Sequence, residues 1–225
     1  MKKKNNHKII DTGIGSAETN MQLDEELLFE LDPQGVPILH LYDWEGPSAT
    51  YGYFIKPEEL FDLEVVKRKG LSLARRPTGG GVVFHLWDYA FSLLMPSNHP
   101  LCFSTPLENY HFVNSLILKA MQPFLPSHSE AELFAVTQAG SFCMEKPTIY
   151  DVVVQGKKIA GAAQRRRKNG YLHQGTISLM APDQSFLQEL LLEKGVGESI
   201  ATCSFVASIE RDQIKSRLRE EFQCL

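Results

Sequence analysis

The sequence lacks the features that define several large classes of protein. Its four cysteines, Cys102, Cys143, Cys203 and Cys224, form no Cys-x-x-Cys pair and have no histidine at zinc-binding spacing. A disulfide framework would be denser and the chain smaller. No apolar run approaches the roughly 20 residues that cross a bilayer, and polar residues follow the basic start where a signal peptide would be apolar. These absences predict a cytoplasmic protein without a membrane span or a bound metal.

An excess of positive charge is also missing. The 225 residues include 23 Lys and Arg against 27 Asp and Glu, which gives a net charge of −4. Nucleic-acid-binding domains are normally basic, so we expect no nucleic-acid partner. The 16 Gly and 12 Pro follow no period and 43% of the side chains are hydrophobic, which excludes fibrous and disordered chains. We expect a single domain over residues 1–225, long enough to bury one large core.

Hydrophobic periodicity and turn residues predict the secondary structure. Helices are expected over residues 23–31, 57–69, 106–124, 184–194 and 209–222. Strands are expected over residues 36–44, 49–54, 71–75, 82–85, 90–95, 150–154, 158–165 and 171–179. Because the turns Gln155-Gly156 and Asn169-Gly170 join neighbouring strands as hairpins, we predict the α+β class, with a mixed, mainly antiparallel sheet and flanking helices.

The most informative stretch reads RRPTGGGVVFH. Two cations, Arg75 and Arg76, precede the glycines Gly79, Gly80 and Gly81. Without Cβ atoms, these glycines let a ligand approach bare backbone N–H groups. Arginines beside such a loop suit a carboxylate or a phosphate. The alternative is a flexible hairpin tip with solvated charges. The lysine of a Walker loop is absent, so the stretch is not an ordinary P-loop.

A second stretch, DVVVQGKKIAGAAQ, ends in small residues against which a bulky ligand can lie. A lysine at the head of this strand can neutralise a developing anion, although most hairpin lysines lie in water. Strand neighbours alternate between faces, so we expect one of Lys157 and Lys158 to point inward. Because the pair opens a hairpin, we also expect that replacing Lys158 leaves the fold intact.

Three other features have both a structural and a functional interpretation. His173 and Gly175 lie in an apolar strand, where a glycine indicates close approach of a ligand or backbone, but a lone strand histidine is more often a core residue. Residues 165–168, RRRK, indicate a solvated hairpin tip or a dock for an acidic protein. Cys143 is either a small buried side chain or a nucleophile that needs a nearby cation, such as Lys158.

Taken in order, these motifs resemble the lipoate-protein ligase A family of the biotin/lipoate ligase superfamily, which includes octanoyltransferases. The resemblance spans about residues 20–190 and includes Asp24-Glu25, the strand LHLYDW and the tripeptide YGY. Biotin ligases differ, with a Gly-Arg-Gly type of loop in place of RPTGGG. The resemblance implies the biotin/lipoate ligase catalytic-domain fold, without the C-terminal accessory domain of longer ligases.

The resemblance also implies a reaction and its participants. Lipoate, or octanoate, becomes amide-linked to one lysine of an acceptor, which is a lipoyl domain of a 2-oxoacid dehydrogenase complex or the glycine-cleavage H protein. Lys158 is the residue expected at the acyl carbonyl. The residues expected to bind the acyl group or its adenylate are Arg75, Arg76, Gly79, Gly80, Gly81, Val83, Phe84, His85, Asp151, Gly161, His173 and Gly175.

Two reaction types occur in this superfamily. Ligases activate free lipoate with Mg²⁺ and ATP as lipoyl-AMP, whereas octanoyltransferases pass the acyl group from acyl carrier protein onto a cysteine. Two motifs of the ligases are altered here: of their Arg-Asn-Asp only Asp151 remains, and their His-Asp after the glycine loop reads His85-Leu86. Cys143 stands where the nucleophile of the transferases would be. Transferases commonly lose the third glycine.

The retained Gly81 therefore makes an ATP-dependent ligase the preferred sequence-based interpretation, with a Cys143-dependent octanoyltransferase as the alternative. A third interpretation is a non-catalytic lipoyl-binding module. The retained Lys158 argues against that interpretation, because a module without activity has no need of a lysine at the acyl carbonyl.

Overall fold

The computed structural model describes residues 6–126, 129–135, 147–193, 195–205 and 209–225. The strands are β1 (Lys8–Gly15), β2 (Ile38–Trp44), β3 (Ser48–Tyr51), β4 (Ser72–Arg75), β5 (Val82–Phe84), β6 (Asp88–Pro96), β7 (Ala131–Leu133), β8 (Val152–Val154), β9 (Lys157–Arg167) and β10 (Gly170–Ser178). The α-helices are α1 (Ala17–Phe29), α2 (Leu63–Arg68), α3 (Pro106–Met121), α4 (Gln184–Leu190), α5 (Val196–Cys203) and α6 (Arg211–Glu221), and the 3₁₀ helices are η1 (Pro57–Glu59), η2 (Gln122–Phe124) and η3 (Phe222–Cys224).

Two sheets organise the described part of the chain. A seven-stranded sheet has the order β1-β2-β6-β10-β9-β8-β7, and a three-stranded sheet has the order β4-β3-β5. In the larger sheet β1 and β2 are parallel and the other neighbouring strands are antiparallel. The prediction of an α+β class with a mixed, mainly antiparallel sheet is confirmed.

Several elements differ from the sequence prediction. The sequence did not predict strand β1, strand β7 or helix α5. Apolar and polar residues alternate poorly along β1, so this strand is defined by its backbone pairing with β2 and not by a sequence pattern. The helix expected over residues 57–69 is split into η1 and α2, because Asp62 caps α2 by accepting from the amides of Glu64 and Val65. Helix α1 begins earlier than expected, since Ser16 caps it.

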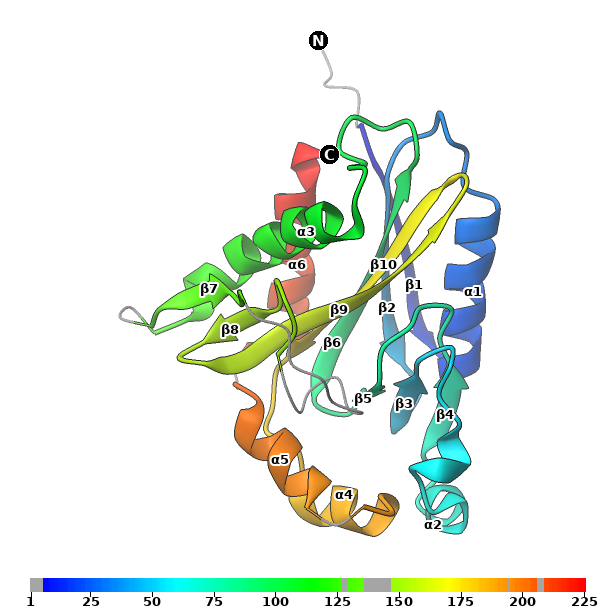
Figure 1. The fold of residues 1–225 in the computed structure, drawn as a ribbon, viewed down its shortest axis with the longest axis vertical. Helices are drawn as coiled ribbons and strands as arrows, with labels where there is room; N and C mark the ends of the chain where they lie inside the picture. Colours follow the sequence, from blue (N-terminus) through cyan, green and yellow to red (C-terminus); the bar gives the residue numbers. More distant parts are fainter. Residues whose placement is uncertain (1–5, 127–128, 136–146, 194, 206–208) are drawn as a thin grey trace.

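The two faces of the large sheet have different coverings (Figure 1). Helices α3 and α6 pack on one face, where the largest apolar cluster includes Leu41, Phe91, Ile117 and Leu218. Helix α1 lies against the other face and also contacts the small sheet. No helix in the described ranges is long and apolar enough to cross a membrane.

Alternation along the strands decides which residues face α1. Because strand neighbours point to opposite faces, the residues between the core side chains of β2, β6 and β10 point away from α3 and α6. Tyr42, Ser92 and Gln174 are such residues, and all three are buried. The α1 face is therefore buried but partly polar, which is the environment of the candidate site.

Candidate active site

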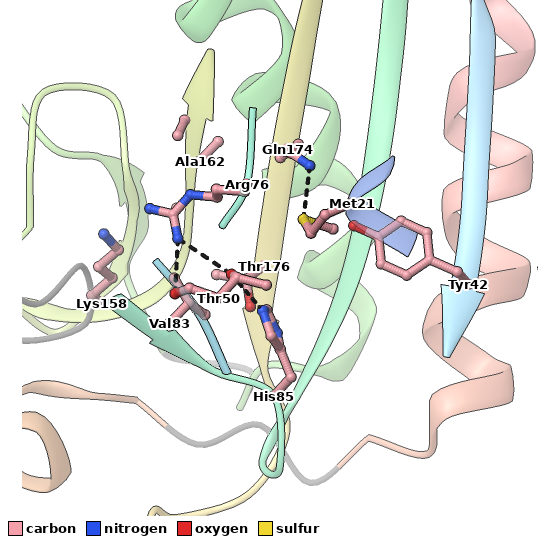
Figure 2. Close-up of a pocket in the computed structure, with 12 residues that line it drawn as sticks. Met21, Tyr42, Thr50, Arg76, Val83, His85, Lys158, Ala162, Gln174 and Thr176 are labelled. Carbon is pink, nitrogen blue, oxygen red and sulfur yellow. Dashed lines mark hydrogen bonds between the residues drawn. The ribbon is translucent and has the colours of Figure 1, made fainter. Parts of the chain in front are cut away.

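A pocket opens between α1, the small sheet and strands β9 and β10 (Figure 2). In Figure 2, the cationic Lys158 and Arg76 lie on one side of the pocket, and Met21 and Tyr42 lie on the other. The lining residues are Met21, Tyr42, Thr50, Arg76, Val83, His85, Lys158, Gly161, Ala162, Ala163, Gln174 and Thr176.

Lys158 reaches this pocket because β9 contains a bulge. The pairing of β8 with β9 shifts by one residue, so Ile159 and Ala160 both pack into the α3 face of the sheet. Regular alternation would place Lys158 and Gly161 on opposite faces of the strand. Because of the bulge, both line the pocket. Lys158 is 3% exposed and Lys157 is exposed, which confirms that one lysine of the pair points inward.

The buried Lys158 is held by Asp151. Lys158 Nζ lies 2.7 Å from Asp151 Oδ2, and both side chains are buried. Thr148 donates to the same oxygen from its amide, at 2.6 Å, and from its hydroxyl. Gly161 makes room for the pair, because a Cβ there would overlap the end of Lys158 and lie 2.7 Å from Asp151 Oδ1. The expectation that the fold does not depend on Lys158 is wrong, since its removal would leave a buried carboxylate without its cation.

Arg76 holds the glycine loop in place. It is 4% exposed and donates to the Gly79 carbonyl at 2.9 Å, to the Gly81 carbonyl at 2.7 Å and to the Thr50 carbonyl at 3.1 Å. With the carbonyls of the loop turned toward Arg76, the amides of Gly79 and Gly80 donate to no group in the described part of the chain. Gly80 has a φ of +84°, which favours glycine. The loop can therefore offer N–H groups to a ligand.

The glycine loop also needs Gly52 beside it. The Gly52 amide donates to the Gly81 carbonyl at 3.1 Å, and a Cβ on Gly52 would overlap the Gly80 carbonyl oxygen and lie 2.9 Å from the Gly79 carbonyl carbon. The YGY tripeptide is thus a close contact of backbone against backbone.

We expect Gly52→Ala to reduce the free energy of unfolding by roughly 1–3 kcal/mol, because the loop must move to admit one methyl group. Urea denaturation measures this loss. Gly79→Ala is the matched control: an added Cβ there meets nothing within 4 Å, so the stability of this variant should stay close to that of the wild type. Equal stability of the two variants would contradict the proposed contact.

Gln174 is a pocket residue that the sequence analysis missed. It accepts from the Thr78 hydroxyl at 2.7 Å and donates to Asp24 Oδ2 at 2.6 Å, so it links the glycine loop to α1. Alternation could have found it, because Gln174 and Thr176 pair across the sheet with the small residues Ala163 and Gly161. Four further lining residues were also missed: Met21, Tyr42, Thr50 and Thr176.

His173 and Gly175 lie on the opposite face of β10 and do not line the pocket. The His173 ring packs near Phe91 and Tyr110, with ring centroids 6.2 and 5.7 Å away. A Cβ on Gly175 would overlap the Phe91 ring, so this glycine serves packing between strands. His173 Nδ1 accepts from Gln164 Nε2 at 2.8 Å, and within the described residues Nε2 has no partner.

Burial lowers the pKa of His173 from 6.5 to about 3. Below pH 6.5 the unfolded chain binds a proton that the folded chain does not, so the free energy of unfolding falls as the pH decreases toward 3. His173→Gln removes this dependence. Between pH 7 and pH 5 we expect the wild type to lose about 2 kcal/mol more than the variant, measured by urea denaturation. Parallel pH curves would mean that His173 is accessible to protons in the fold.

The remaining predicted site residues are distributed around the pocket. Val83 and His85 line it, whereas Phe84 points to the opposite side of β5, where it packs on Phe61. Arg75 is exposed, and its guanidinium lies over the Tyr53 ring at 4.8 Å. Cys143 lies outside the described residues.

The arginines at the tip of the β9–β10 hairpin are not simply solvated. Arg166 donates to the carbonyls of Phe103 and Ser104 at 3.1 and 2.7 Å. Arg165 donates to the Pro77 carbonyl at 2.9 Å, and its guanidinium also lies over the Tyr53 ring, at 4.9 Å. These two side chains attach the hairpin to neighbouring loops.

Comparison with known proteins agrees with this geometry. Residues 16–223 match the family described as the lipoyl protein ligase A/B catalytic domain. Octanoyltransferase LipM of Geobacillus kaustophilus is 31% identical over 224 residues, which cover 96% of this chain and 74% of that protein. Octanoyltransferase LipM of Staphylococcus aureus is 33% identical over 176 residues, which cover 75% of this chain and 64% of that protein.

Solved structures show the same fold. A putative lipoate protein ligase from Thermoplasma acidophilum with bound lipoic acid superposes with a TM-score of 0.76 at 24% identity, over 96% of this chain and 84% of that one. Lipoate-protein ligase A bound with ATP gives a TM-score of 0.74 at 24% identity, over 97% and 84%. The chain therefore belongs to the lipoyl protein ligase A/B catalytic-domain family.

Proposed function

We propose that this protein is an octanoyltransferase that moves an octanoyl group from acyl carrier protein to a lysine of a lipoyl acceptor domain. The observation that carries the acyl-transfer part is the buried Lys158–Asp151 pair at the side of a pocket lined with small residues. The acceptors would be lipoyl domains of 2-oxoacid dehydrogenase complexes or the glycine-cleavage H protein.

Lys158 has the position and charge to stabilise the reaction. A carbonyl carbon under attack places negative charge on its oxygen, and a fixed cation in a site without water lowers the energy of that charge. Asp151 fixes Lys158 through an ion pair of 2.7 Å. The small residues Gly161, Ala162 and Ala163 line the same pocket as Lys158, so an acyl chain can lie along β9 with its carbonyl at Lys158.

The choice of a thioester donor rests on relatives and on charge. The octanoyltransferases LipM are 31–33% identical to this chain, and Cys143 stands where the resemblance implies the nucleophile. An open groove lies beyond His85. Its described lining residues include three carboxylates, those of Asp43, Glu210 and Asp212, and one guanidinium, that of Arg211. Those carboxylates would repel a polyphosphate that extended into this groove. This interpretation reverses the preference for a ligase that the retained third glycine suggested.

An ATP-dependent lipoate-protein ligase is the second candidate, because the Gly79 and Gly80 amides have no partner in the described chain and suit a phosphate. In that reaction Mg²⁺ would help ATP to activate the carboxylate. Asp151, the one residue of the ligases' Arg-Asn-Asp that this chain retains, is engaged by Lys158. The described residues contain no cluster of three acidic, histidine or cysteine side chains that could hold a metal ion, and Mg²⁺ that arrives with ATP is held largely by phosphates and water.

One experiment separates the candidates. The protein is incubated with an apo lipoyl domain and octanoyl-acyl carrier protein, and in parallel with octanoate or lipoate plus Mg²⁺ and ATP. Mass spectrometry of the lipoyl domain should show octanoylation of one lysine with acyl carrier protein as donor and no need for ATP. Modification with the ATP mixture alone would establish the ligase, and none with either donor would leave a binding module.

A further inference from the structure

A hydrogen-bonded chain of three side chains ends in the pocket. His85 Nδ1 lies 2.8 Å from Asp88 Oδ2, and His85 Nε2 lies 2.9 Å from Thr50 Oγ1. All three residues are at least 95% buried. Thr50 and His85 line the pocket together with Lys158 (Figure 2). Nucleophile-activating sites have this arrangement, in which a hydroxyl meets a histidine that a carboxylate orients.

The donors around the chain fix the proton positions. Arg76 has no acceptor atoms, so its contact with Thr50 Oγ1 at 3.3 Å uses the hydroxyl oxygen as acceptor. The Thr50 proton is then directed to His85 Nε2, which must be unprotonated. The Nδ1 proton is directed to Asp88, whose Oδ2 also accepts from the Thr176 hydroxyl. His85 is therefore held as the tautomer with its proton on Nδ1. The lone pair on Nε2 faces the hydroxyl of Thr50, which lines the pocket.

The plane of the His85 ring is also fixed by its neighbour Trp44. Trp44 stacks on the ring at a centroid distance of 3.9 Å and an interplanar angle of 15°, so the imidazole plane cannot rotate freely. The geometry thus allows His85 to accept a proton without moving.

We propose that His85 is the general base in the second half of the reaction, in which the acceptor lysine takes the octanoyl group from the enzyme's thioester. Thr50 is then a proton relay and Asp88 a positioning residue. This proposal rests on the proposed function. The neutral amine of the acceptor lysine attacks the acyl carbon and a C–N bond forms. The bond between the acyl carbon and the enzyme's sulfur breaks, and its electron pair stays on sulfur. The surplus amine proton passes to Thr50 Oγ1, whose own proton passes to His85 Nε2. The imidazolium then releases the proton to water, and the enzyme's sulfur is left as the thiolate that accepts the next acyl group.

A second buried pair in the chain provides a control. His40 Nδ1 lies 2.8 Å from Asp24, and His40 Nε2 lies 3.0 Å from Thr12 Oγ1. The composition is the same, but neither His40 nor Thr12 lines the pocket. A variant of His40 therefore reports the cost of breaking a buried histidine–carboxylate pair without removing the proposed base.

The test measures the two half-reactions separately in the full chain. The variants are His85→Ala, the near-isosteric Thr50→Val, Asp88→Asn and the control His40→Ala. Each is loaded with octanoyl-acyl carrier protein, and the acyl-enzyme is then mixed with an apo lipoyl domain or with hydroxylamine. Hydroxylamine is a weakly basic amine whose adduct loses its surplus proton readily to water, so its attack depends little on a base of the enzyme.

For His85→Ala we expect normal loading, normal discharge to hydroxylamine, and a discharge to lysine that is slower by about 100- to 10,000-fold. Thr50→Val and Asp88→Asn should show the same selective loss, and His40→Ala an unchanged ratio of the two discharge rates. If both discharges slowed equally, or if the discharge to lysine were undiminished, His85 would not be the base. The proposed function would be unaffected by that result. A wild type that loads from no donor would refute the proposed function, and this assignment with it.

Discussion

Lys158→Met should reduce octanoyl transfer to a lipoyl domain by about 100- to 1000-fold, because a fixed charge beside the developing oxyanion is lost. The same change should reduce the free energy of unfolding by about 3–5 kcal/mol, since Asp151 is left as a buried charge without its cation. Lys157→Met is the matched control. Its side chain is exposed one residue away, so both activity and stability should remain near wild type.

The double variant Lys158→Met/Asp151→Leu separates catalysis from folding. Replacing both members of a buried ion pair with apolar side chains is often neutral or stabilising, so urea denaturation should show that most of the lost stability returns. Transfer measured by mass spectrometry should remain as low as in Lys158→Met. If activity returned together with stability, Lys158 would be a structural residue and the assignment of the site would fail.

Cys143→Ser should abolish octanoyl transfer from acyl carrier protein. The serine hydroxyl is far less nucleophilic than a thiolate at neutral pH, so no acyl-enzyme forms. In the wild type, mass spectrometry after digestion should locate the octanoyl adduct on the peptide that carries Cys143, and this peptide should be unmodified in the variant.

Cys102→Ser is the control for this experiment. Burial raises the pKa of the Cys102 thiol, which keeps it protonated and unreactive near neutral pH, so its replacement should leave the adduct and the transfer rate unchanged. If Cys143→Ser instead retained lipoylation in the presence of lipoate, Mg²⁺ and ATP, the acyl group would travel as an adenylate and the ligase candidate would stand.

The sequence by itself determined the family and the local structure around the main motifs. Hairpin turns at Gly156 and Gly170 and the alternation of Lys157 with Lys158 are short-range patterns, which depend on the backbone period of two in a strand. The hairpin turns predicted the α+β class and the order of the motifs indicated the family, and the matched family and the solved structures agree with both. Such features need no knowledge of which strands become neighbours.

The tertiary structure decided which residues meet in the pocket. Alternation separates His173 from Gln174, but the packing of α3 on one face and α1 on the other determines that Gln174 is the pocket residue. The bulge at residues 159–160 depends on pairing with β8. Gln174 contacts Asp24 across 150 positions of sequence. Contacts at such separations follow from strand order and helix packing, and a local sequence pattern contains no record of either.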